Sequence, residues 1–137
     1  MRWIAATAFI AALALAASAQ AGSSATVVIR HQTHGCHAWS VNGNAYKASQ
    51  VLRIARGTTV TFSNNDVMRH TLMQTSGAKV AILHAKMGHM SATARVVFKQ
   101  PGVYRFKTNA GEDYPGIPDS MGTIGKDNVL RLTIHVS

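Results

Sequence analysis

The sequence contains little cysteine and little acid. One cysteine among 137 residues excludes an internal disulfide framework, CxxC redox motifs and zinc sites built from two or four cysteines. The chain has 5 Asp+Glu against 14 Lys+Arg, which gives a formal net charge of +9. Long apolar runs are missing beyond residue 21, so no later segment predicts a membrane span. The 47% hydrophobic content excludes a disordered chain, and the length fits one domain.

The N-terminus carries the one long apolar run. Residues 1–3 (Met-Arg-Trp) give a positive start, residues 4–17 are almost wholly apolar, and the stretch Ala-Ser-Ala-Gln-Ala at 17–21 fits a signal-peptide cleavage pattern twice. We therefore predict a secretory signal peptide at 1–21 and a single domain at 22–137. The expected location of the mature protein is periplasmic or extracellular.

The mature region consists of short segments in which apolar and polar residues alternate. Such segments, rich in β-branched residues and separated by Gly, Pro and Asn, predict β-strands. The predicted class is all-β, with a Greek-key sandwich of about seven or eight strands. An irregular stretch at 109–127 is long enough to predict a functional loop. The expected strands are 25–31, 50–55, 58–62, 70–74, 79–83, 93–99, 103–108 and 128–136.

The histidines gather around the single cysteine. The segment His-Gln-Thr-His-Gly-Cys-His at 31–37 holds three histidines and the cysteine, and His70 follows an Asn-Asn-Asp turn. Met87, His89 and Met90 form a further group. Thiolate, imidazole and thioether are the ligands that select copper or zinc, whereas calcium and magnesium need oxygen ligands. The inventory therefore predicts a copper or zinc site.

Two motifs resemble the cupredoxin pattern, that of the plastocyanin and azurin superfamily. The motif G-x-x-V-x-F-x-N-x-D-x-x-x-H at 57–70 is similar to the cupredoxin segment in which the final His is the first copper ligand. The motif K-Q-P-G-x-Y-x-F at 99–106 is similar to the hairpin that leads to the remaining ligands. The resemblance extends from about residue 25 to residue 136, and it implies a cupredoxin-like domain.

The chain departs from the blue-copper pattern in its last loop. In blue-copper cupredoxins the strand after Pro-Gly-x-Tyr runs into a Cys, a His and a Met. Here the Cys position falls at Thr108, and 107–128 contains no Cys or His. The cupredoxin topology places the loop after the first strand at the same end as His70 and the late loop. We therefore predict that the thiolate comes from the early loop, at Cys36.

The predicted metal site combines one thiolate with imidazoles and one weaker ligand. Red-copper cupredoxins of the nitrosocyanin type use Cys, two His and a Glu, which is a similar inventory in a different order. The first choices are Cys36, His37 and His70, with His34 as the competitor of His37. The candidates for the fourth position are Met90, Met87, His89 and Glu112.

Other residues near these motifs have supporting roles in the prediction. A ligating histidine usually donates its second ring nitrogen to an acceptor, and the Asn-Asn-Asp turn at 64–66 offers candidates. Trp39 is expected to pack in the core. His84 and His135 have no ligand-type neighbours, so they are expected to be surface or packing residues.

The ligand chemistry predicts an electron carrier rather than an enzyme. A thiolate with two imidazoles holds Cu(II) and Cu(I) in nearly one geometry, which favours one-electron transfer. The alternative is an exported copper storage or delivery protein, and zinc is the second choice of metal. Lys and Arg are spread singly, with no run of three, which argues against nucleic-acid binding. We expect a monomer that meets a redox partner, an acidic one by charge, or an anionic surface.

Overall fold

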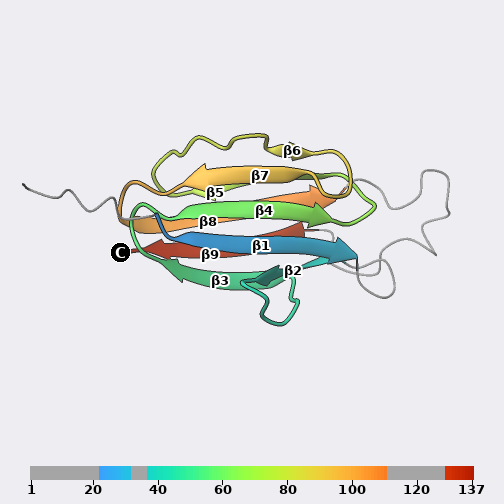
Figure 1. Ribbon diagram of the computed structural model, residues 1–137, viewed down its shortest axis with the longest axis horizontal. Helices are drawn as coiled ribbons and strands as arrows, with labels where there is room; N and C mark the ends of the chain where they lie inside the picture. Colours follow the sequence, from blue (N-terminus) through green and yellow to red (C-terminus); the bar gives the residue numbers. More distant parts are fainter. Residues whose placement is uncertain (1–21, 32–36, 111–128) are drawn as a thin grey trace, which may run out of the picture.

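The computed structural model describes residues 22–31, 37–110 and 129–137, which form a sandwich of two β-sheets (Figure 1). One sheet has the strand order β2-β1-β4-β7 and the other β3-β9-β8-β5-β6. None of the described residues forms a helix with the length and apolar character of a membrane span. The strands are β1 Ser24–His31, β2 His37–Val41, β3 Ser49–Ile54, β4 Thr59–Asn65, β5 His70–Ser76, β6 Lys86–Met87, β7 Thr93–Val97, β8 Gly102–Ala110 and β9 Val129–Val136.

The all-β sandwich predicted from alternation is confirmed, but the expected strand at 79–83 is wrong. Its only pairing with β7 is an isolated bridge between Leu83 and Arg95. Gly77, with φ +97°, turns the chain away directly after β5, and a Cβ there would lie 2.6 Å from the Val103 carbonyl oxygen. Val80 and Ile82 still pack against the core, which explains the apolar pattern of the segment without a β-ladder.

Strand β2 was not predicted because it shows no alternation of exposed and buried residues. All five of its residues are buried. Although β2 is the last strand of its sheet, Lys47 exchanges two backbone hydrogen bonds with Trp39 and covers the outer edge. Trp39 lies in the core as predicted, and its Nε1–H donates to the Arg131 carbonyl at 3.2 Å.

The apolar positions of both sequence motifs lie in the core between the sheets. Val60 and Phe62 of β4 are fully buried, and Phe62 lies 6.0 Å from Phe106, centroid to centroid. The Tyr104 hydroxyl donates to the Gln100 carbonyl at 2.8 Å, which closes the Pro-Gly turn before β8. These residues form the hydrophobic core, so we look for the polar residues of a functional site at the ends of the strands.

Parallel pairing brings several strand ends together. β1 and β4 are parallel neighbours, so both end on the same side of the molecule, with their arrowheads together in Figure 1. His31 at the end of β1 pairs with His37 at the start of β2, and His70 at the start of β5 pairs with Ala110 at the end of β8. We call this side, formed by the ends of β1, β4 and β8 and the starts of β2 and β5, the histidine end.

Candidate metal centre

A braced turn after β4 aims the Asp66 carboxylate into the histidine end. The Asp66 amide donates to Asn64 Oδ1 at 3.0 Å, and Asp66 Oδ1 accepts from the Met68 amide at 2.9 Å. Asn64 Nδ2 donates to the carbonyls of Met68 and Met87, at 2.8 and 3.1 Å. These bonds satisfy the buried Asn64 side chain and fix the turn, so Asp66, at 1% exposure, is held in one position.

Two buried histidines meet at one oxygen of this carboxylate. His37 Nδ1 lies 2.6 Å and His70 Nε2 lies 3.0 Å from Asp66 Oδ2. An ionised carboxylate only accepts hydrogen bonds, so both ring nitrogens donate. In the neutral rings, the lone pairs then lie on Nε2 of His37 and on Nδ1 of His70. The Thr108 hydroxyl, 3.0 Å from His70 Nδ1, donates to that second lone pair.

Asp66 remains ionised in this buried place. Burial alone would raise the pKa of Asp66, but hydrogen bonds from His37, His70 and the Met68 amide, with the charge of His37, hold that pKa well below its usual range. Asp66 is also the only acid among the described residues. The histidine end therefore combines a fixed negative charge with several imidazoles.

His31 adds a buried nitrogen that lacks a hydrogen bond. Its Nδ1 lies 3.7 Å from Asp66 Oδ1, which is too long for a hydrogen bond, and no described residue offers this buried atom a hydrogen-bonding partner. The ring lies edge-on to that of His37, with centroids 5.3 Å apart. A buried polar atom without a partner costs roughly 1–3 kcal/mol, so a ligand bound at this atom would be stabilising.

Ligand-type atoms of His31, His37 and Asp66 all lie within 4.8 Å of one another. Two imidazoles and a carboxylate form a donor set that copper and zinc both accept. The donors come from the end of β1, the start of β2 and the turn after β4, so the sheet fixes their spacing. The residues present therefore fit a transition-metal ion, with His70 beside the group and both of its ring nitrogens already hydrogen-bonded.

The structure brings together some of the predicted ligands. His37 and His70 are both buried and share Asp66, and their metal binding stays a prediction. Cys36, His34 and Glu112 lie outside the described residues.

The methionine candidates lie in two different environments. Met87 is buried in the core cluster and is paired in register with His70. Met90 is 48% exposed, and the His89 ring donates from Nδ1 to the Met90 carbonyl at 2.8 Å.

Sequence reasoning missed His31 and Asp66 as members of the donor group. Asp66 was considered only as one hydrogen-bond acceptor in the turn at 64–66, and there it is indeed the residue that accepts from the histidines. The sequence feature that could have identified Asp66 is that it is the only acid before residue 112. His31 could have been found from its register opposite His37, but only with β2 recognised as a strand.

Comparisons with known proteins found solved structures that are only distantly similar to this chain. No family model matches the chain, and no curated protein matches its sequence. A purple cupredoxin from Nitrosopumilus maritimus is 18% identical and covers 82% of this chain and 98% of its own, with a TM-score of 0.44. A mutant of amicyanin in the reduced state is 16% identical over 88% of each chain, with a TM-score of 0.42.

A third similar structure is that of a protein with a name of a different kind. An inclusion body protein from Burkholderia cenocepacia is 9% identical and covers 88% of this chain and 97% of its own, with a TM-score of 0.45. A cupredoxin is thus among the structures to which this chain is distantly similar. At these identities and TM-scores, the function has to be argued from the residues of this chain.

Proposed function

We propose that this chain is an exported copper-binding protein that transfers single electrons through one metal site at the histidine end. The observation that carries the proposal is the group of half-buried His31 with buried His37 and Asp66, which offer one ligand-type atom each within 4.8 Å of one another. Cys36 directly precedes His37 in the sequence, which supports a thiolate as a further ligand. Copper, when bound to such donors, supplies a reversible one-electron couple.

Although Asp66 belongs to the group of ligand-type atoms, in this proposal the imidazoles are the ligands and Asp66 is the residue that positions them. By accepting from His37 Nδ1, its carboxylate fixes the imidazole orientation and leaves the ring lone pair on Nε2. A carboxylate behind a ligating histidine also raises the basicity of the ring. The buried Nδ1 of His31 has the lone pair and the position to serve as a second imidazole ligand when the proton is on its other nitrogen.

His70 takes part in a way that Thr108 controls. The residue at the blue-copper cysteine position is a threonine here, and its hydroxyl bonds to the ring nitrogen that would otherwise bind metal. His70 therefore becomes a ligand only when this hydrogen bond is given up. This supports a site displaced from the blue-copper position toward β1 and β2. Cys36 and His34 lie between these two strands in the sequence.

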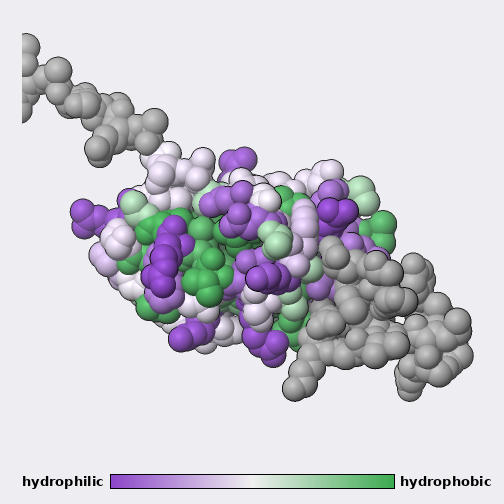
Figure 2. Space-filling model, turned by 90° about the horizontal axis from the view of Figure 1, so that it is seen from below, coloured by the Kyte–Doolittle hydropathy of each residue, from purple (hydrophilic) through white to green (hydrophobic). Residues whose placement is uncertain are grey.

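Surface charge supports the proposed partners. The one acid of the described residues is buried, and every other charged side chain there is Lys or Arg. Figure 2 shows hydrophilic residues scattered over one face of the sandwich around an apolar area, rather than gathered in one block. Such a surface favours an acidic redox protein or an anionic surface, in contacts that salt weakens. We expect the protein to act as a monomer.

The test is the visible spectrum of the purified protein after copper addition, with metal stoichiometry. We expect one copper per chain and an intense thiolate-to-copper band that is absent in Cys36→Ser. His135→Ala is the matched control and should keep the band, because His135 lies on β9 outside the donor group. A colourless complex with one copper per chain would instead favour storage or delivery. Failure to bind copper stoichiometrically would refute both functions.

A further inference from the structure

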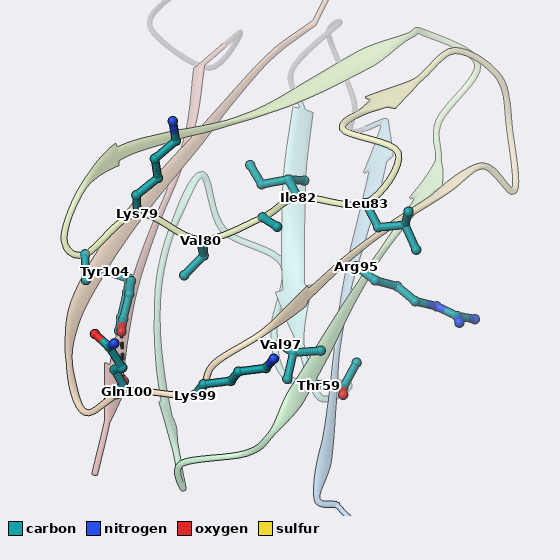
Figure 3. Close-up of a pocket in the computed structure, with 12 residues that line it drawn as sticks. Thr59, Lys79, Val80, Ile82, Leu83, Arg95, Val97, Lys99, Gln100 and Tyr104 are labelled. Atoms are coloured by element: carbon teal, nitrogen blue, oxygen red, sulfur yellow. Dashed lines mark hydrogen bonds between the residues drawn. The ribbon is translucent and has the colours of Figure 1, made fainter.

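A cavity of about 760 Å³ lies away from the histidine end, between β7 and the segment at 78–83 (Figure 3). Its lining includes Thr59, the first residue of β4, whereas the Asp66 turn follows the last residue of that strand. The length of β4 separates the two places by about 20 Å. The cavity is therefore independent of the proposed metal site, and of whether that proposal holds.

The cavity lies where the segment at 78–83, apart from Leu83, does not pair with β7. Leu83 and Arg95 exchange two backbone hydrogen bonds, at 2.9 and 3.0 Å, but the segment before Leu83 does not continue along the strand. β7 is the edge strand of its sheet. In an antiparallel strand, the backbone N–H and C=O groups of successive residues point alternately to the two sides of the strand. Val97 lies two residues after Arg95, so its N–H and C=O point to the same side as those of Arg95, away from β4.

The two kinds of lining side chain occupy different parts of the cavity. The apolar part of the lining, which we call the floor, includes Val80, Ile82, Val97 and the ring of Tyr104. Apolar surface of this kind gains free energy when a ligand removes it from water. The volume lies in the range of small-molecule sites.

The charged groups of the lining are all cationic. Lys79, Arg95 and Lys99 line the cavity, and the one acid of the described residues, Asp66, is not part of this lining. In Figure 3, Lys99 extends along the wall toward Val97 and Thr59, whereas Lys79 and Arg95 point outward from the rim. An anionic group beside Lys99 would gain a charge-assisted hydrogen bond, with the Val97 N–H nearby as a further donor.

We propose that this cavity binds a small amphipathic anion, a molecule with an apolar body and a single carboxylate or phosphate group. The body covers the floor formed by Val80, Ile82 and Val97, and the anionic group lies beside Lys99. The same lining disfavours cationic amphiphiles, because the three charges around it are positive.

The experiment is a titration of the purified protein with dodecanoate below its micelle concentration, followed by calorimetry and amide NMR shifts. We expect saturable binding of one ligand, with shifts concentrated at 78–83 and 95–100. Lys99→Glu should weaken binding by at least about tenfold, since the charge is reversed. Lys47→Glu makes the same charge change on an exposed residue outside the cavity, and it should alter affinity less than about twofold.

Further arms separate this ligand class from its rivals. Dodecyl phosphate should also bind, and the tighter of the two anions identifies the preferred head group. Val97→Asp places a carboxylate on the floor at a 44% exposed position and should abolish binding without unfolding the protein. Equal binding of dodecyltrimethylammonium, the same shifts with inorganic phosphate alone, or unchanged affinity in Lys99→Glu would each overturn the proposal.

Discussion

The histidine end and the cavity beside β7 show two ways in which a β-sandwich makes a site. At the histidine end, strand ends bring buried polar groups together, and these groups satisfy one another around Asp66. At the cavity, the edge strand β7 has no further strand beside it, and the lining includes apolar residues and exposed cations. The first site is part of what holds the protein together, whereas the second can change with little effect on folding.

The largest expected effect is on stability at the histidine end. Asp66→Ala removes the acceptor of two buried ring N–H groups and of the Met68 amide. We expect the free energy of unfolding to fall by about 3 kcal/mol, measured by urea denaturation of the metal-free protein. Asp66→Asn should lose less, because its amide oxygen still accepts. A loss below about 0.5 kcal/mol for Asp66→Ala would mean that the histidine end and the cavity do not differ in their contribution to stability.

Metal affinity should depend on the same residues. His37→Ala should lower copper affinity at least about 100-fold by loss of a ligand, and Asp66→Asn about 10- to 100-fold because a neutral amide does not raise the basicity of His37 as the carboxylate does. His135→Ala is the control and should leave affinity unchanged. Competition with a chelator of known affinity measures these losses, and equal small losses in all variants would place the metal elsewhere.

Thr108 tests whether His70 is a ligand. Thr108→Ala removes the hydroxyl that bonds to His70 Nδ1, so the metal-free protein should lose about 1 kcal/mol of unfolding free energy. If His70 binds copper, the same variant should gain copper affinity, because the ring nitrogen no longer has a competing bond. An unchanged or lower affinity would restrict the site to the donors near β1 and β2.

The pH dependence of stability follows from the lowered pKa of Asp66. A carboxyl group with a lower pKa in the folded state stabilises the fold above its unfolded pKa, about 3.9, and loses this contribution as the pH falls through the folded value. The difference in unfolding free energy between the wild type and Asp66→Asn should therefore shrink below about pH 4. A difference that grows as the pH falls from 4 to 2 would contradict this sign.

The smallest effect is expected at the cavity. Lys99 and Val97 are exposed, so Lys99→Gln and Val97→Thr should each change the free energy of unfolding by less than about 0.5 kcal/mol. Urea denaturation of these two variants and of Asp66→Ala under the same conditions gives the direct comparison. A loss of several kcal/mol in Lys99→Gln would show that this region also holds the fold together.

The sequence predicted the scaffold better than the donor group. Alternation identified β4, β8 and β9 because one face of each strand is buried, but it missed β2, where both faces are buried. It also assigned a strand to 79–83, since apolar residues that pack on the core alternate even without a ladder. The meeting of His31 with His37 and Asp66 depends on register and on parallel pairing, which alternation does not encode.

The central claim is that copper binds at the histidine end with a thiolate and imidazoles from β1, β2 and the loop between them. X-ray absorption at the copper edge of the copper-loaded protein tests this most directly, because sulfur and nitrogen ligands scatter at different distances. We predict one short sulfur shell with two or more nitrogen or oxygen ligands, and loss of the sulfur shell in Cys36→Ser. A wild-type spectrum with nitrogen and oxygen shells alone, or a sulfur shell that persists in Cys36→Ser, would contradict the account.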